Sequence, residues 1–335
     1  MTRLGHYIYV EALAGVAVQT DDPRLDHLVG ELRSPLRVGV AGRAGTGCST
    51  VARALRRCGV TVVAAGVVVT DPGEESDVDV YVVAETLKPE DRAALTRPAR
   101  PRVAVLNKAD LTGFGGDGPV AAAAARCERL RRAIGAPIYP LAALAAVAAL
   151  ERGVLDSAMV DALQVLTAEP ATLGSADGFL TGEHRLDRPI RERLLTHLDL
   201  FGIAHSVVAL RDGADRAGVA AALRRASGVD AVLAAVTRAA APARYRRLAE
   251  ETSVEVCADD AAVAARMSVA IDVVEAAGLA VDRDDDLDAH LRRAVAVRRY
   301  SRGPVSDLQR RCADDIVRGS LRRWERGGGV PEAVG

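Results

Sequence analysis

A glycine-rich turn is the first part of the chain whose residue types and spacing suggest a chemical role. The glycines follow an apolar, β-branched run at 36–41 and precede a helical pattern at 49–57. In such a strand-to-helix turn, glycines let successive backbone N–H groups converge on phosphate oxygens at the helix N terminus. The spacing GxxxxG-x-S therefore predicts a phosphate-binding loop. Its predicted contacts are Gly42, Gly45, Thr46, Gly47, Cys48, Ser49 and Thr50.

The turn departs from the phosphate-binding motif at one position. Ser49 stands where the motif has its Mg²⁺ ligand, but Cys48 stands where the motif requires the lysine that reaches the β and γ phosphates. A neutral thiol does not supply that charge. Because glycine-rich turns also join strands to helices for steric reasons alone, this turn by itself leaves phosphate binding and a purely steric role both open.

A second polar motif follows another apolar run, at 102–106. It consists of Asn107, Lys108 and Asp110, which are expected at the carboxyl end of a buried strand, where open α/β sheets bind ligands. Of the 44 basic residues only Lys88 and Lys108 are lysines, and the rest are arginine. A lysine is therefore unusual in this chain, and its presence in the NKxD pattern favours a functional interpretation.

Taken in order, these motifs resemble those of translation-factor-type GTPases such as the Era and dynamin-like groups. The resemblance implies that Asp110 accepts hydrogen bonds from the ring N–H and the exocyclic amine of guanine, and so selects guanine over adenine. It also implies that Asn107 ties its loop to the phosphate loop and that the aliphatic stem of Lys108 covers the base. The Ser-Ala-Leu motif of these proteins corresponds to 142–144, where the N–H of Ala143 would meet the guanine oxygen. The implied ligands are GTP or GDP with Mg²⁺.

The residues that would carry out hydrolysis do not follow the same pattern. The DxxG motif should follow the third strand, but Thr70 is in register with Gly73 and Asp71 comes one place late. Only 22 residues separate Thr50 from Gly73, which leaves no room for an ordinary first switch loop. Because these parts and the loop lysine position the γ-phosphate, Mg²⁺ and water, we expect hydrolysis to be slow or absent.

The order of the patterns predicts an α/β fold with a P-loop NTPase-like, mostly parallel sheet domain followed by an α-helical domain. The expected limits are 36–150 for the nucleotide domain and 151–326 for the helical domain. Residues 1–35 are expected to pack on the nucleotide domain, and 327–335 to form a flexible tail. Strands are expected at 60–70, 79–84 and 102–106, and a further strand from 138 precedes the motif at 142–144. Helices are expected at 89–96, 127–133, 155–168 and 189–200, and a loop at 170–183.

The segment 189–248 resembles the helical region after the GTPase domain in bacterial dynamin-like proteins of the isoniazid-inducible type. The similar features are a leucine-rich helix leading to Phe201-Gly202 and a Ser227-Gly228-Val229 turn that opens the next helix. The chain is too short to hold the long stalk and membrane paddle of those proteins. The resemblance therefore implies a protein partner, an intact GTPase paralogue, more than membrane remodelling.

Charge is unevenly distributed at the C-terminal end. Residues 291–326 contain 11 arginines and four acidic residues, with Trp324 among them, which predicts contact with an anionic membrane or an acidic partner. The preferred alternative is a solvated helix whose apolar side packs on the body through Leu308, Ile316, Val317 and Leu321. Similarly, the acidic run 282–288 predicts either a cation site or, in preference, an acidic N terminus for a helix that begins near Leu287.

Composition limits the remaining classes. The longest apolar run, 141–150, is too short to span a membrane, the N terminus does not read as a secretory signal, and five scattered cysteines indicate reduced thiols. A formal net charge of −1 argues against a nucleic-acid partner. We expect a cytoplasmic location, at most peripheral to the inner membrane. The leading function is a degenerate GTP-binding protein; the alternatives are a nucleotide-free pseudo-GTPase and a P-loop enzyme of another lineage whose NKAD sequence is accidental.

Overall fold

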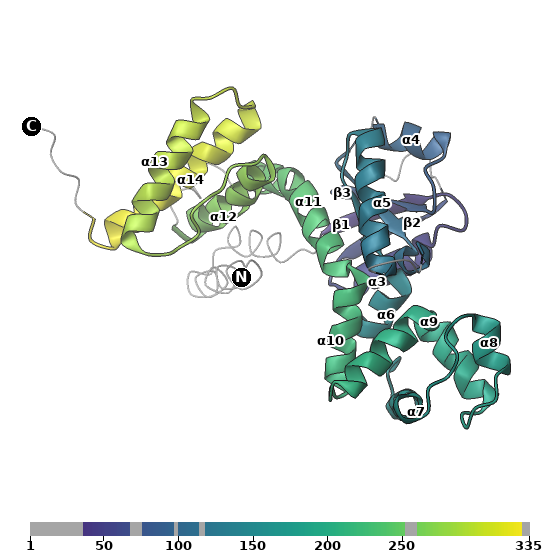
Figure 1. Cartoon of the computed structure of the whole chain (residues 1–335). Helices are drawn as coiled ribbons and strands as arrows, with labels where there is room; N and C mark the ends of the chain where they lie inside the picture. Colours follow the sequence, from purple (N-terminus) through teal and green to yellow (C-terminus); the bar gives the residue numbers. More distant parts are fainter. Residues whose placement is uncertain (1–35, 68–75, 97–99, 114–117, 252–259, 330–335) are drawn as a thin grey trace, which may run out of the picture. The chain divides into compact units, whose positions relative to one another are not determined.

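The computed structural model describes residues 36–67, 76–96, 100–113, 118–251 and 260–329 (Figure 1). The segment 1–35, expected to pack on the nucleotide domain, lies outside the described residues, as does most of the expected tail. The chain divides into two compact units. The first comprises Leu36–Val236, and the described part of the second begins at Thr237.

A five-stranded parallel sheet forms the centre of the first unit. Its strands are β1 (Arg37–Gly42), β2 (Thr61–Val67), β3 (Val78–Ala84), β4 (Arg102–Asn107) and β5 (Ile138–Leu141). Their spatial order is β2-β1-β3-β4-β5, and every neighbouring pair is parallel. The central strand β3 is buried along 78–83, as its near-continuous apolar sequence requires in a sheet covered on both faces. The expected α/β class is therefore confirmed.

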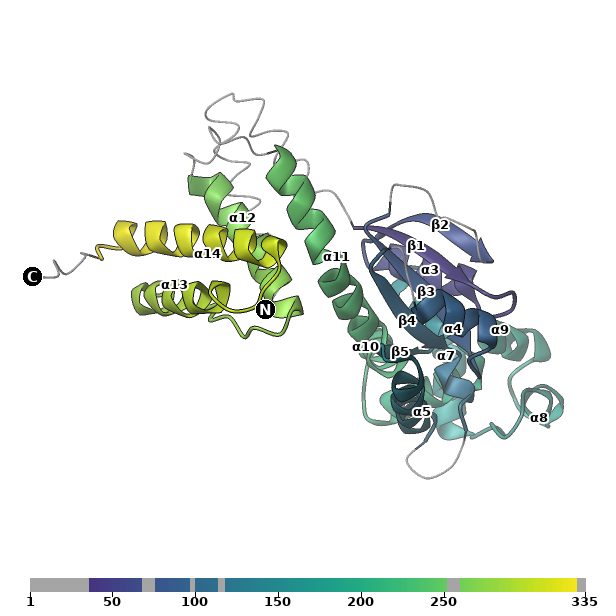
Figure 2. The ribbon, with the colours of Figure 1, turned by 90° about the horizontal axis from the view of Figure 1, so that it is seen from above.

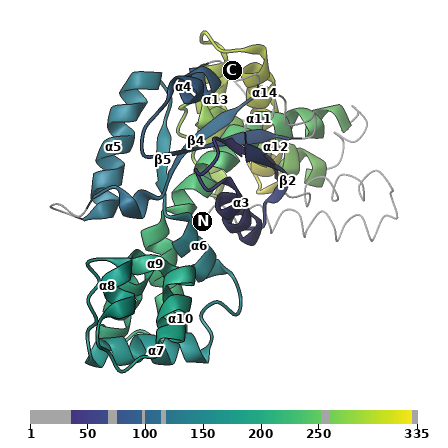
Figure 3. The ribbon, with the colours of Figure 1, turned by 90° about the vertical axis from the view of Figure 1, so that its right-hand side faces the viewer.

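Three helices connect the strands and cover the two faces. They are α3 (Cys48–Arg57), α4 (Pro89–Thr96) and α5 (Pro119–Ile134). The chain turns one way from β1 to β2 and the other way from β3 to β5, so right-handed crossovers place α3 on one face and α4 and α5 on the other, as Figure 3 shows. Beneath α4 and α5, Tyr81, Leu106 and Cys127 share a buried cluster. Burial raises the pKa of the Cys127 thiol to about 11, so this cysteine is a packing residue.

Five further helices belong to the same unit as the sheet. They are α6 (Ala143–Leu150), α7 (Ser157–Ala168), α8 (Ala176–Thr181), α9 (Arg188–Arg211) and α10 (Arg216–Ser227). They share a core in which Met159, Leu163 and Leu194 are fully buried. The compact unit therefore ends after Val236, whereas the sequence predicted a boundary at 150. The physical reason is α6, which is apolar on all sides and packs on α3, α9 and α10.

Two local expectations in this region need correction. The predicted loop 170–183 contains the short helix α8, because Ser175 caps it by accepting a hydrogen bond from Gly178 N at 3.0 Å and Phe179 is buried beneath it. The helix expected at 127–133 begins earlier, at Pro119, which suits a first helical turn.

Among the described helices, only α9 is long and apolar enough to cross a membrane. Its Leu194, Leu198 and Ile203 are almost fully buried against the neighbouring helices, and Asp199 interrupts it with a positive φ of 54°. The buried side chains place α9 in the helical core of the first unit, and a peripheral location at a membrane remains a prediction.

The described part of the second unit is helical. Its helices are α11 (Val229–Glu251), which begins in the first unit, α12 (Asp260–Ala276), α13 (Leu287–Ser301) and α14 (Asp307–Arg326). Figure 2 shows α13 and α14 side by side. The core contains Tyr245, whose hydroxyl donates to Asp315 Oδ2 at 2.6 Å. Four apolar residues of α14 were expected to pack on the body. Ile316 is buried and Leu308 and Val317 pack partly buried against the same core, which confirms the expectation for these three, whereas Leu321 is exposed.

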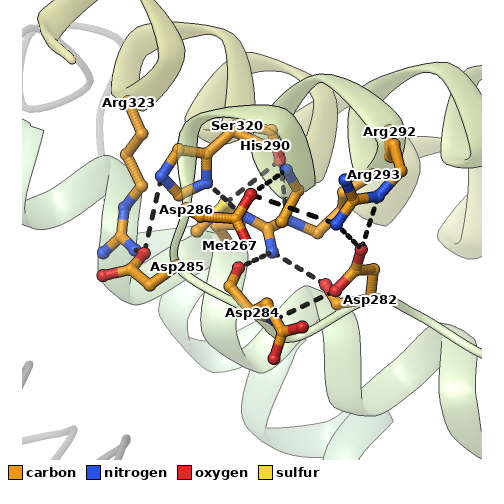
Figure 4. Close-up of polar contacts among 11 residues, drawn as sticks. Met267, Asp282, Asp284, Asp285, Asp286, His290, Arg292, Arg293, Ser320 and Arg323 are labelled. Carbon is orange, nitrogen blue, oxygen red and sulfur yellow. Dashed lines mark hydrogen bonds and ion pairs between the residues drawn. The ribbon is translucent and has the colours of Figure 1, made fainter.

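The acidic run before α13 is part of a polar cluster rather than a free surface (Figure 4). Asp286 caps α13 by accepting from Ala289 N at 2.7 Å, which confirms the expected acidic helix N terminus. Arg293, which is 3% exposed, donates to His290 Nδ1 at 2.6 Å and to Asp282 O at 2.7 Å. These bonds attach the loop 282–286 to α13.

Candidate functional site

The glycine-rich turn forms a tight loop between β1 and α3. Gly45 and Gly47 have φ values of 82° and 88°, a left-handed conformation that L side chains rarely adopt. Thr46 closes the loop on itself, because its backbone N and its hydroxyl both donate to Arg43 O, at 3.2 and 2.8 Å. The sequence therefore places glycines at two positions where the loop conformation requires them.

The first glycine is required by close packing. A Cβ added at Gly42 would collide with Val82 O and would lie 2.9 Å from both Cys48 Sγ and Thr46 Oγ1. The Cys48 thiol also lies 3.4 Å from Thr46 Oγ1. Cys48, which stands where the motif predicted from the sequence has lysine, therefore faces the start of the loop.

The N terminus of α3 is positively polarised. Its N-cap residue, Gly47, makes no side-chain cap, and its first turn contains no acidic residue. The first N–H groups of a helix have no partner within the helix, so they carry partial positive charge and attract anions. Ser49 is exposed at this end and Thr50 is half-buried. Backbone N–H groups are thus presented at the place where the sequence predicted phosphate.

Asn107 connects this loop to a second one. Its side chain is buried at the end of β4, where Nδ2 donates to Thr46 O at 2.9 Å and Oδ1 accepts from Ala143 N at 3.2 Å. The structure therefore brings together the glycine-rich loop, the NKxD segment and the segment at 142–144. These three lie at the carboxyl ends of β1, β4 and β5.

The rest of the NKxD segment turns outward from β4. Lys108 is exposed and has a left-handed backbone, and a short 3₁₀ helix, η1 (Ala109–Leu111), follows it. Asp110 is half-buried, and its pKa is raised mainly by burial, with a smaller contribution from the nearby charge of Asp199 at the break in α9. The proximity of Asp199 to this segment was not expected from the sequence.

Helix α10 holds the segment at 142–144 from the other side. Ala142 N donates to Ser227 O at 2.9 Å, at the last residue of α10. Gly228 follows with a φ of 76°, and a Cβ there would lie 2.6 Å from Pro140 O. The sequence indicated the Ser-Gly turn, but a backbone carbonyl has no sequence signature, so its partner was not predicted.

An ion pair joins the loop to α4, and the sequence did not predict it. Arg43 Nε donates to Asp91 Oδ1 at 2.9 Å and to Oδ2 at 3.0 Å, and Asp91 is fully buried. The carboxylate of Asp91 accepts two further hydrogen bonds, from Tyr81 Oη at 3.1 Å and from Lys88 N at 2.9 Å. The only sequence signal was an acidic residue in the first turn of a helix.

Ser49 is the one predicted Mg²⁺ ligand within the described residues. No group of three or more His, Cys, Asp or Glu side chains that would hold a metal ion occurs in the part of the chain that the structure describes. Mg²⁺ is usually bound through one or two protein oxygens together with substrate phosphates and water, so a single hydroxyl fits that role only with nucleotide present. Thr70, Asp71 and Gly73 lie outside the described residues.

The glycine-rich loop, the NKxD segment and the segment at 142–144 lie where parallel sheets bind ligands. The strand order reverses between β1 and β3, and in open α/β sheets ligands bind beyond the carboxyl ends of the strands at such a reversal. No protein-family model matches this chain, and a search of curated proteins finds no significant match. The argument for function therefore rests on the geometry of these loops.

Proposed function

We propose that the chain is a degenerate GTP-binding protein, with a P-loop NTPase-like nucleotide domain and helices that act as a partner or regulatory surface. The observation that carries the proposal is the bridge made by Asn107 between Thr46 O and Ala143 N. One buried amide keeps two loops in register, as a protein requires when one loop binds the phosphates and the other meets the base of the same nucleotide.

Guanine is the base that fits the NKxD segment. Asp110 lies three residues after Asn107, and its carboxylate accepts hydrogen bonds but donates none when ionised. Guanine offers two adjacent donors to such a carboxylate, whereas adenine does not offer that pair. A site built around these contacts rejects an analogue that lacks them, because buried polar groups would then be left unpaired. Lys108 supplies an aliphatic stem beside the base.

The chemistry of hydrolysis is poorly supported by the loop. The backbone N–H groups at the start of α3 would bind phosphate oxygens, and Ser49 would take Mg²⁺ together with those oxygens. Cys48 adds no charge to stabilise the transferred phosphoryl group. We therefore propose that turnover is slow or absent unless a partner protein contributes a cation.

The position of Cys48 also favours a second candidate function. Its Sγ lies against the start of the loop, beside Thr46 Oγ1, and so fills part of the loop with a neutral group. A protein that keeps the fold but binds no nucleotide needs a filled, well-packed loop and no cation for phosphate. In that case the chain acts as a non-catalytic interaction protein that pairs with an intact GTPase.

Isothermal titration of the whole chain with GTP, GDP and ATP, with and without Mg²⁺, tests the proposal. We expect GTP and GDP to bind and ATP to bind much more weakly. Asp110→Ala should remove the guanine preference, while Asp177→Ala, which removes an exposed acid of α8, should leave it unchanged. Equal affinity of the unchanged chain for ATP and GTP would contradict guanine selection, and no binding of any nucleotide would favour the pairing function.

A further inference from the structure

Arg43 is held in place at both its backbone and its side chain. Its carbonyl oxygen accepts from Thr46 N and from Thr46 Oγ1, within the glycine-rich loop. Its Nε donates to both oxygens of Asp91, a fully buried carboxylate in the first turn of α4. The guanidinium therefore has a defined position, because its backbone and its Nε are both bound.

Asp91 does not depend on Arg43 alone. Its Oδ1 also accepts from Tyr81 Oη and its Oδ2 from Lys88 N, at 3.1 and 2.9 Å. The pKa of Tyr81 is raised to about 12, mainly by burial and further by the adjacent Asp91, so the phenol keeps the proton that it donates. A buried charge is costly unless it is paired and hydrogen-bonded, and these two donors stabilise the carboxylate even when Arg43 also contacts another anion.

The guanidinium of Arg43 has hydrogen-bonding capacity left over. An arginine carries five N–H donors, and the contact with Asp91 uses the one on Nε. Within the described residues, neither Nη1 nor Nη2 makes a hydrogen bond, and the side chain is 23% exposed. Four donors on a fixed, always-charged group thus remain for a solvent-borne acceptor.

The guanidinium of Arg43 belongs to the same loop in which the motif's lysine charge is missing. Arg43 directly follows β1 and Asp91 belongs to the helix after β3, so their ion pair crosses the point where the strand order reverses. The position where the phosphate-loop motif has its cationic lysine holds Cys48, and a thiol cannot carry a positive charge. Arginine binds phosphate oxygens through paired N–H groups more specifically than lysine does.

We propose that Arg43, positioned by Asp91, binds the phosphate groups of the nucleotide through Nη1 and Nη2 and so supplies the charge that Cys48 lacks. This inference rests on the proposed function, because it requires a phosphate-bearing ligand at the loop. It identifies Arg43 as a phosphate-binding residue and Asp91 as a positioning residue.

Calorimetry with three probes, GDP, guanosine and inorganic pyrophosphate, tests this role. Arg43→Gln should weaken GDP and pyrophosphate binding at least about tenfold, since it removes charge-assisted hydrogen bonds, and should leave guanosine binding unchanged. Arg43→Lys keeps the charge and should bind GDP more tightly than Arg43→Gln. The matched control is Arg53→Gln, which removes an arginine of α3 that pairs with Glu151 and should have no effect.

The outcomes separate the two proposals. If Arg43→Gln binds GDP as tightly as the unchanged chain, the role of Arg43 is wrong while nucleotide binding stands. An equal loss of GDP and guanosine binding would show that Arg43 is structural and would also overturn the inference. If the unchanged chain binds none of the three probes, both the inference and the proposed function fail.

Discussion

Gly47 and Asn107 lie so close together that a methyl group on the first would collide with the side-chain amide of the second. The same amide nitrogen donates to Thr46 O at 2.9 Å. The glycine therefore serves two purposes: it allows the left-handed backbone at the start of α3, and it allows a buried side chain from β4 to reach the loop. This contact is the basis of the first two predictions.

Alanine at Gly47 should be more harmful than alanine at Gly45. Both glycines have positive φ, so each substitution costs about 1–2 kcal/mol of backbone strain, but only at Gly47 does the new Cβ meet Asn107. We expect Gly45→Ala to lower stability by that strain alone and Gly47→Ala to lower it further and to weaken nucleotide binding. Denaturant unfolding measured by circular dichroism checks this, and equal losses in the two variants would contradict the contact.

Aspartate and alanine at Asn107 should affect the bridge differently. Asn107→Asp keeps an acceptor for Ala143 N but loses the donor to Thr46 O, whereas Asn107→Ala loses both bonds. Each buried group left unpaired costs about 1–3 kcal/mol. Hydrogen exchange of the Ala143 amide should stay slow in Asn107→Asp and become fast in Asn107→Ala. Slow exchange in both variants would show that another group protects this amide.

Lysine at Cys48 should tighten the binding of GTP and GDP. A cation beside the phosphates adds a charge-assisted contact, for which we expect at least about a tenfold gain in affinity. The control is Cys48→Met, because methionine is similar in length to lysine but uncharged, and it should not tighten binding. Turnover should stay on the order of 10⁻⁴ s⁻¹, the slow end for unaided GTPases, because the DxxG register and the switch loop are still missing. Rapid hydrolysis by either variant or by the unchanged chain would refute our account of the loop.

The second unit should lose stability as the pH falls below about 6.5. Burial and the charge of Arg293 lower the pKa of His290 from 6.5, and the opposing charges of Asp285 and Asp286 do not reverse this shift. In the folded chain His290 Nδ1 accepts a hydrogen bond from Arg293, which favours the neutral ring (Figure 4). The unfolded chain has no such contact and binds a proton at about pH 6.5. The free energy of unfolding is therefore highest above about pH 6.5. It decreases as the pH falls from there to the lower pKa that His290 has in the folded chain.

Trp324, the only tryptophan, reports on this unit through its fluorescence during thermal unfolding. His290→Gln, which retains an acceptor but does not titrate, should make this transition less dependent on pH between 7 and 5. His205→Gln is the control: burial also lowers the pKa of His205, but it belongs to the first unit. An unchanged pH dependence in His290→Gln would exclude His290 as its source.

Local patterns in the sequence were sufficient to locate most strands and helices around the site. The apolar run at 102–106 predicted β4, and Pro89 followed by acidic residues predicted α4 with its limits as observed. Such predictions succeed because backbone conformation and burial depend on side chains within a few positions of one another. Patterns failed at α8, where a single capping serine and one buried phenylalanine outweighed a loop-like composition.

The sequence by itself determined the glycine-rich turn and the NKxD segment, and its resemblance to GTPases implied that Asn107 reaches the loop. Only the tertiary structure decided that Arg43 pairs with Asp91, that Ser227 O accepts from Ala142 N, and that the first unit extends to Val236. Every residue has a carbonyl and many have a charge, so residue type does not specify which distant donor meets which acceptor. That choice depends on strand order and on which helices cover each face of the sheet, and these are properties of the whole unit.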